Sequence, residues 1–315
     1  LGGVYVSSVW GTDARVAGRA TAEWDYTLFG TVAALVAIGL VMVHSASVDY
    51  ALRTTENSMS FVGRHAVYLV VAGVGAVLIA RTRVVWWEHG GPYLLLIGIS
   101  LLGLVLIPGL GSHVNGSSRW IKLGPIGVQP SELMKLFMVV YVAGYLVRKQ
   151  EEIKRFTTGI LMVSIVVAAV SALLLLEPDL GSVVVIGLTV FTMLFLGGVR
   201  FWHFLLVVGG AVIGVILLTV IAPYRMNRVT SFLDPWADPF GTSFQLVQAL
   251  IAFGRGEWLG VGLGASVQKL SYLPAAHTDF VFAVLAEEFG LVGVLGVILL
   301  WALVVMRAFA TARLA

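Results

Sequence analysis

Long apolar segments alternate with short polar stretches over most of this chain. A helix needs about 20 predominantly apolar residues to cross the hydrocarbon core of a bilayer. The pattern therefore predicts an all-α polytopic integral membrane protein. The first segment is too long for a secretory signal peptide, so we expect it to stay in the mature chain. About eight transmembrane helices are predicted, near residues 26–46, 64–80, 92–109, 132–147, 157–176, 180–198, 202–222 and 290–310.

Composition agrees with a membrane location. Hydrophobic residues make up 59% of the chain and charged residues 12%, whereas soluble domains carry about a quarter charged residues. Small residues, such as the 36 glycines, allow transmembrane helices to approach closely. The chain has no cysteine, which excludes disulfides, thiolate nucleophiles and cysteine-based metal sites. It has no long run of like charges, so nothing indicates a nucleic-acid-binding arm.

Basic residues in the short connections predict the orientation, because cytoplasmic loops carry an excess of Lys and Arg. If the N-terminal segment 1–25 is cytoplasmic, the densest basic clusters also lie on that side. The two longest connections, 110–131 and 223–289, then face outward. We expect residues 26–315 to form a single transmembrane domain that includes the long outer segment.

The outer segment 223–289 is unusually long, and long ordered loops tend to carry function. It contains aromatic residues suited to the membrane interface, two Asp-Pro turn signals and a short amphipathic pattern that predicts a helix near 243–253. Its glycine-rich stretch GVGLGAS lacks the lysine of a phosphate-binding loop. A compact turn near the membrane surface is the better interpretation of that stretch.

Charged residues surround the start of the predicted helix 132–147. Ser131 is a candidate N-cap, and Glu132 lies in the first turn, where the helix dipole favours an anion. Lys135 follows three residues later, so an ordinary ion pair would satisfy both charges, although ionisable residues at membrane depth are also functional candidates. Arg119 is either an interfacial anchor or part of a site for a phosphate headgroup.

Two carboxylates, Glu177 and Asp179, flank Pro178 after the predicted helix 157–176. Proline ends the helix there. The carboxylates form either a solvated turn or a cation site of the oxygen-rich kind that Mg²⁺ prefers. A divalent cation, Mg²⁺ or Mn²⁺, is therefore a candidate cofactor.

The stretch LPAAHTDFVFAVLAEEFG, residues 273–290, places acidic groups in apolar surroundings. His277 and Thr278 indicate a helix boundary, and Asp279 is expected to begin the helix. Asp279 is either a partner of the helix dipole or a partly buried carboxylate that takes a proton from a hydroxyl. Glu287 lies about 80° around the helix from Asp279, so the two acids need not act together.

Four stretches, NGSSRWIKLGPIGVQPSELMKL, EPDLGS, RVTSFLDPWADPFGTSFQLVQALIAFGRGEWLGVGLG and LPAAHTDFVFAVLAEEFG, together resemble the SEDS family (shape, elongation, division, sporulation). The cell-division branch is the nearest and the elongation branch the second choice. The resemblance implies a multi-pass enzyme of the bacterial inner membrane, at the division septum, that polymerises lipid II into peptidoglycan glycan strands. It further implies that a class B penicillin-binding protein supplies the transpeptidase and that other division proteins are partners.

The resemblance also implies site residues. It makes Asp279 the catalytic residue and places Glu132 and Lys135 in the cavity beneath it. Family members usually have ten spans, so we expect this chain to lack the last two.

The chemistry of lipid II polymerisation sets two tasks, which are to stabilise the departing pyrophosphate and to deprotonate an acceptor hydroxyl. Asp279 suits the second task. A lipid II flippase and a non-catalytic division scaffold are the alternative functions, and Asp279 would be dispensable in the scaffold. The residues expected to bind substrate are Arg119, Lys122, Glu132, Lys135, Arg228 and His277.

Overall fold

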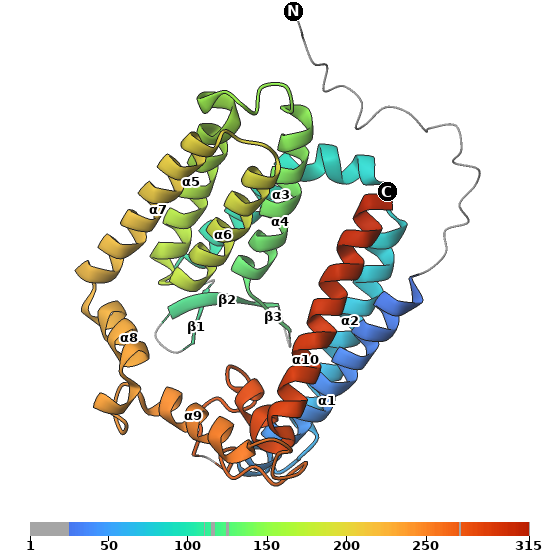
Figure 1. Ribbon diagram of the computed structural model, residues 1–315, viewed down its shortest axis with the longest axis vertical. Coiled ribbons are helices and arrows are strands. Elements are labelled where there is room, and N and C mark those ends of the chain that lie inside the picture. Colours follow the sequence, from blue (N-terminus) through green and yellow to red (C-terminus); the bar gives the residue numbers. More distant parts are fainter. Residues whose placement is uncertain (1–24, 110, 115–116, 124–125, 271, 315) are drawn as a thin grey trace, which may run out of the picture. The chain divides into compact units, whose positions relative to one another are not determined.

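The computed structural model describes residues 25–109, 111–114, 117–123, 126–270 and 272–314 (Figure 1). The predicted cytoplasmic segment 1–25 therefore lies outside the described residues, except for Asp25. Contacts divide the chain into two compact units, one formed by 1–73 with 227–315 and the other by 74–226. The expectation of a single transmembrane domain stays a prediction.

Most of the predicted spans correspond to helices. Seven described helices are long and apolar enough to cross a membrane, while Leu180–Leu196 is apolar but shorter. A π-helical turn, Thr157–Leu161, precedes α5. The apolar helices before the outer segment are α1 (Tyr26–Thr55), α2 (Ser60–Arg81), α3 (Val84–Val105), α4 (Pro130–Arg148), α5 (Met162–Leu176), the shorter α6 (Leu180–Leu196) and α7 (Phe201–Ile221).

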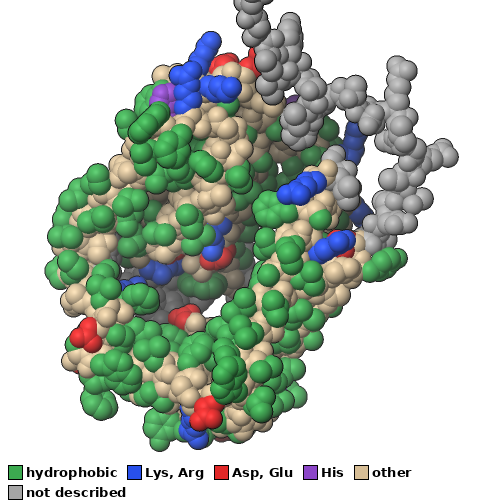
Figure 2. All heavy atoms as spheres, viewed as in Figure 1, with side chains coloured by type: hydrophobic (Ala, Val, Ile, Leu, Met, Phe, Trp, Pro, Cys, Tyr) green, Lys and Arg blue, Asp and Glu red, His purple; other side chains and the backbone are tan. Residues whose placement is uncertain are grey.

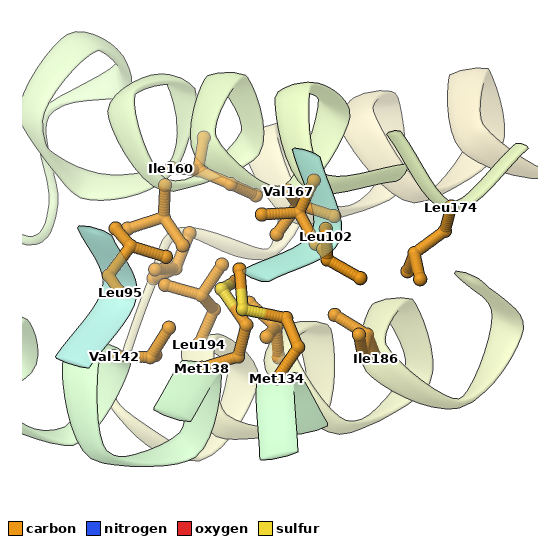
Figure 3. Packing of buried hydrophobic residues seen from close by; sticks show 14 of the residues in the cluster. Leu95, Leu102, Met134, Met138, Val142, Ile160, Val167, Leu174, Ile186 and Leu194 are labelled. Atoms are coloured by element: carbon orange, nitrogen blue, oxygen red, sulfur yellow. The ribbon is translucent and has the colours of Figure 1, made fainter. Parts of the chain in front are cut away.

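The unit 74–226 has an apolar core between α3, α4, α5 and α6. Leu102, Met134 and Met138 are fully buried there and lie close together (Figure 3). Glycine lets α3 and α4 come into close contact, since a Cβ added to Gly91 would lie 3.0 Å from the Cα atom of Tyr141. This is the kind of approach through small residues that packs helices in a membrane.

The predicted loop 110–131 contains a small sheet that the sequence analysis did not anticipate. Its antiparallel strands, β1 (Gly111–Val114), β2 (Ser117–Leu123) and β3 (Ile126–Val128), follow the order β1-β2-β3. The β1–β2 register shifts between Ser112 and His113, which marks a bulge. Strands this short are hard to recognise beside spans of about 20 apolar residues, because their alternating pattern covers only a few positions.

The unit formed by 1–73 with 227–315 contains α1, α9 (Phe244–Gly256) and α10 (Val281–Leu314), while α2 and α8 (Pro223–Leu233) cross the boundaries between the units. Helices α1 and α10 run side by side (Figure 1). Their shared core includes Met42, Ala46 and Val284. The amphipathic helix predicted near 243–253 is confirmed as α9, whereas α8 was not predicted.

Helix α10 differs from the predicted span 290–310. It begins earlier, at Val281, and its backbone is not helical at Gly290, where φ is 63° and ψ is −164°. A break at this point frees backbone groups from the helical hydrogen-bond pattern. In a membrane protein such groups must find partners within the protein.

Glu257 and the start of the glycine-rich stretch supply these partners. The amides of Val261 and Gly262 donate to the carbonyls of Glu287 and Glu288, at 2.9 and 3.1 Å. After the break, the amide of Leu291 donates to the carbonyl of Glu257 at 2.9 Å. Gly260 has a positive φ of 79°, and an added Cβ would collide with the carbonyl of Glu288. The stretch therefore completes the broken helix, which explains its glycines better than a free surface turn does.

Apolar side chains cover much of the outer surface of the helices (Figure 2). Neither α2 nor α7 has a buried residue, although both are long and apolar. In water such surfaces would be unfavourable, whereas lipid tails are as apolar as the side chains themselves. The chain is a multi-pass membrane protein.

Candidate functional site

Asp279 lies in a tight turn two residues before α10 begins, and not within the helix as expected. The turn is closed by hydrogen bonds from the amides of Thr278 and Phe280 to the carbonyl of Ala275, at 3.1 and 3.3 Å. Ala275 has a positive φ of 55°. The Asp279 side chain is exposed, so the expected partial burial is wrong. Its carboxylate is therefore accessible from outside the protein.

His277 is half-buried in an aromatic cluster beside this turn. Its ring stacks on Tyr50 of α1 with the centroids 4.8 Å apart, and meets the edge of Phe61 of α2 at 5.1 Å. Burial lowers the pKa of His277, and the nearby negative charge of Asp279 opposes that shift. The imidazole therefore favours its neutral form at neutral pH. Tyr50 and Phe61 were missed because nothing in the sequence links residues so far apart.

Glu287 is fully buried but has several donors. Ser266 donates through its hydroxyl to Oε2 at 2.5 Å, and the amides of Val267 and Gln268 donate at 3.1 and 3.3 Å. The Nε atom of Arg255, on α9, lies 3.6 Å from Oε1. All four of these partners come from residues 255–268, which precede α10 in the sequence.

Glu288, the next residue, is held by a different set of groups. Lys269 donates from Nζ to Oε1 at 2.7 Å. Ser45 of α1 donates from Oγ to the same carboxylate at 2.7 and 2.9 Å, and Lys269 also donates to Ser45 at 2.8 Å. The pair is deeply buried, since the side chain of Lys269 is 9% exposed and that of Glu288 is 0% exposed. The sequence analysis left both residues without a role.

In the other unit, α4 begins with Gln129 as the N-cap residue, and Ser131 does not cap it. Ser131 is buried and accepts a hydrogen bond from Nε2 of Gln129 at 3.0 Å. Glu132 lies in the first turn, as expected, and its Oε2 is 2.6 Å from Nζ of Lys135. The two side chains are 57% and 30% exposed, respectively. The predicted ion pair is confirmed.

A cavity of about 250 Å³ lies between α4 and α6, next to this ion pair. Apart from Lys135 and Thr189, its lining is apolar. Among the described residues that line the cavity, Lys135 is the one with a charged side chain. An apolar cavity with a single cation at its edge suits a ligand that has both a hydrocarbon part and a negative charge.

Arg119, on β2, contacts the turn between α5 and α6. Its Nε donates to the carbonyl of Glu177 at 3.1 Å, and its Nη2 donates to the carbonyl of Pro178 at 2.5 Å. The guanidinium thus fastens the small sheet to this turn. Arg228 is exposed on α8, and Lys122 belongs to β2 but its side chain lies outside the described part.

The two carboxylates of this turn differ. Asp179 caps α6, accepting from the amide of Ser182 at 3.2 Å and from its hydroxyl at 2.7 Å. Glu177 is 1% exposed, and neither of its carboxylate oxygens has a hydrogen-bond partner among the residues whose positions the structure gives. Burial raises the pKa of Glu177 to about 7, Asp179 adds to the increase, and Arg119 opposes it. The expectation of a solvated turn is wrong for both residues, because both are buried.

A metal site at this turn stays a prediction. Glu177 has free oxygens, whereas both oxygens of Asp179 are occupied by Ser182. Across the residues whose positions are given, no group of three or more histidine and acidic side chains is arranged to hold a metal ion. A cation at Glu177 would therefore need backbone carbonyls or water as further ligands.

The predicted site residues belong to both units of the chain. Asp279 and His277 lie together in one unit, and Arg228 belongs to the same unit. The other unit holds the Glu132–Lys135 pair and the contact of Arg119 with the turn at Glu177.

Comparison with known proteins identifies the family. The pattern of the FtsW, RodA and SpoVE family, described as a cell cycle protein, matches residues 26–315. The chain belongs to this family. It is 52% identical over 303 residues to a probable peptidoglycan glycosyltransferase FtsW of Nitrosococcus halophilus, covering 96% of this chain and 78% of that protein. It is 50% identical to the corresponding protein of Aromatoleum aromaticum, covering 92% and 72%.

Solved structures support the same assignment. A chain of a peptidoglycan synthase complex, described for its structural coordination of polymerization and crosslinking, superposes with a TM-score of 0.72 at 31% identity. The superposition covers 93% of this chain and 79% of that chain. The rod shape determining protein RodA of Thermus thermophilus gives a TM-score of 0.62 at 25% identity, covering 93% and 76%. The predicted fold class and SEDS family are confirmed.

Proposed function

We propose that this protein is a peptidoglycan glycosyltransferase of the FtsW type, which polymerises lipid II and releases undecaprenyl pyrophosphate. Its strong similarity to probable peptidoglycan glycosyltransferases supports this activity. The observation that carries the catalytic assignment is the exposed carboxylate of Asp279 in a closed turn beside a half-buried imidazole. A hydroxyl of a sugar can reach such a carboxylate, and general-base catalysis requires this access.

Asp279 acts as the general base in this proposal. The 4-hydroxyl oxygen of the acceptor sugar forms a bond to the anomeric carbon of the donor. The bond between that carbon and the pyrophosphate oxygen breaks, and the hydroxyl proton passes to Asp279. Direct displacement inverts the anomeric carbon and gives the β linkage without a covalent glycosyl-enzyme. His277 helps to bind the substrate through its uncharged ring.

The cationic residues bind the pyrophosphate of lipid II. Lys135 is the strongest candidate, because it lines an apolar cavity and its ion pair with Glu132 is partly exposed. Arg119, Lys122 and Arg228 supply further positive charge on the segments predicted to face outward. Fixed cations that meet the growing negative charge of a leaving group stabilise the transition state.

Three further assignments complete the proposal. A class B penicillin-binding protein with transpeptidase activity binds through its transmembrane helix, together with other membrane proteins of cell division, and the enzyme works at the septum. A similar chain occurs in a peptidoglycan synthase complex, which supports such a partnership. Glu177, whose carboxylate oxygens have no hydrogen-bond partner among the described residues, would hold a divalent cation.

Labelled lipid II tests this function directly. The full chain, purified with its transpeptidase, should convert lipid II to glycan strands that separate by length on a gel. Vesicles containing the same protein should also be assayed for movement of lipid II between leaflets. Movement of lipid II without any polymer would contradict the proposal and favour a flippase.

A further inference from the structure

Two adjacent acidic residues of α10, Glu287 and Glu288, are buried and fully paired, yet the proposed reaction does not use them. Neighbouring residues on a helix point about 100° apart. Glu287 accordingly contacts residues 266–268, whereas Glu288 contacts Lys269 and α1. We propose that this acidic pair positions Asp279, an inference that rests on the proposed function.

The contacts of the pair close the loop that contains Asp279. The hydrogen bond between Ser266 and Glu287 joins residues 21 apart in the sequence, and the bond between Lys269 and Glu288 joins residues 19 apart. Asp279 lies between the two ends of both loops. Closing a flexible loop removes much of its conformational freedom, so each contact restricts the positions that Asp279 can occupy.

Helix α1 fixes the same loop at two points. Ser45 donates to Glu288 near one end of the loop, and Tyr50 stacks on His277 two residues before Asp279. Between these points, the amide of Leu273 donates to the carbonyl of Gln268 at 2.8 Å, and the Leu273 side chain is buried. The segment is thus held along its length and not only at its ends.

Stability alone gives no reason to use charges here. Replacing a buried ion pair with apolar residues of similar volume often leaves a protein equally or more stable. A carboxylate that accepts two or three directed hydrogen bonds does something that an apolar side chain cannot, because it fixes the register of one segment against another. Misplacing a catalytic group by about 1 Å can reduce the rate about 100-fold.

The decisive variant replaces both members of the buried ion pair, Lys269→Met with Glu288→Leu, so that no charge is left unpaired. A matched control, Lys149→Met with Glu152→Leu, removes another Lys–Glu pair, whose nitrogen–oxygen distance is 3.1 Å and which is partly exposed between α4 and α5. Both double variants should fold and keep thermal stability close to that of the wild type.

Spin labels measure the position of the loop directly. These 315 residues contain no cysteine, so Thr278→Cys and Leu52→Cys introduce one label beside Asp279 and one on α1. Both side chains are exposed. The distribution of distances between the labels should be narrow in the wild type and in the control, and clearly broader in the Lys269→Met, Glu288→Leu variant.

Glycan polymerisation should follow the same pattern in unlabelled protein. We expect the buried-pair variant to lose about 10-fold or more in kcat with KM for lipid II unchanged, and the control to keep its activity. An unchanged distance distribution together with wild-type kcat would overturn the inference and leave the pair with a structural role only.

Two parallel samples keep the outcome unambiguous. If the double variant fails to fold, Ser45→Ala replaces it. This change removes the contacts of the Ser45 hydroxyl with Glu288 and Lys269 and leaves the ion pair in place. A wild-type distance distribution and kcat in Ser45→Ala would then overturn the inference. Asp279→Asn is assayed alongside. Full activity of Asp279→Asn would reject the proposed function, whereas an inactive Asp279→Asn beside a fully active buried-pair variant would reject only the positioning role.

Discussion

Two Lys–Glu ion pairs with almost the same nitrogen–oxygen distance occur in different environments. Glu132 and Lys135 are separated by 2.6 Å, lie three residues apart on α4 and are partly exposed. Lys269 and Glu288 are separated by 2.7 Å, lie 19 residues apart and are buried together with Ser45. The exposed pair leaves its cation accessible to a ligand, whereas the buried pair connects three segments. Environment, and not distance, decides what each pair does.

Neutralising the glutamate of each pair should give the largest difference between the two pairs, measured as the loss in free energy of unfolding. Glu288→Gln leaves the buried ammonium of Lys269 without its counter-charge and should lower the free energy of unfolding by about 3–5 kcal/mol. Glu132→Gln breaks the exposed pair and should lower it by less than about 1 kcal/mol. Thermal unfolding in detergent checks both values. Equal losses in the two variants would show that burial does not distinguish the pairs.

Glu177 extends the comparison to a buried carboxylate without a partner. Its pKa rises from 4.5 to about 7 on folding, so the folded protein keeps this proton where the unfolded chain loses it. Stability should therefore fall as the pH rises from about 4.5 to 7, by at most about 3 kcal/mol. Unfolding temperatures across this pH range should show the decrease in the wild type, and Glu177→Gln should remove it. A decrease of the same size in Glu177→Gln would assign it to other groups.

Two glycine substitutions compare a close backbone contact at the broken helix α10 with an open position in the continuous helix α6. Gly260→Ala places a Cβ against the carbonyl of Glu288 at a positive φ, and it should destabilise the protein on the order of 1–3 kcal/mol. Gly187→Ala, in α6, meets no atom within 4 Å and should leave stability unchanged or slightly higher. Thermal unfolding of the two variants checks this difference. A stable, active Gly260→Ala protein would contradict the close backbone contact.

Lys135→Ala should lower stability by less than about 1 kcal/mol, because the pair that it breaks is partly exposed. Its effect on the reaction should be much larger. Loss of a charged contact made in the transition state reduces the rate about 10²–10³-fold. Polymer formed per folded molecule separates the two effects. Unchanged turnover with lower stability would mean that the ion pair is structural only.

The sequence predicts those features that depend on neighbouring residues. Hydropathy over about 20 residues indicates most of the membrane helices, and a spacing of three residues predicts the Glu132–Lys135 contact. Both inferences need only the periodicity of one helix. The resemblance to SEDS proteins then identifies the family, which hydropathy alone cannot do.

Other features depend on segments that meet only in the folded protein. The partners of Glu288 come from Lys269 and from Ser45 on α1, and no local pattern links these positions. The break at Gly290 is hidden because one glycine inside a helical pattern does not by itself mark the end of a helix. Serine is a common N-cap residue, but the N-cap position of α4 is taken by Gln129, directly before Pro130, and not by Ser131. Pro130 at the first helical position fits the common preference for proline there.

The catalytic role of Asp279 is the central claim, and one substitution tests it most directly. Asp279→Asn keeps the shape of an exposed side chain and removes its ability to accept a proton. The full chain with its transpeptidase should remain folded and assembled, while the glycan formed from labelled lipid II falls about 100-fold or more. Near-normal glycan formation by folded Asp279→Asn protein would contradict the account.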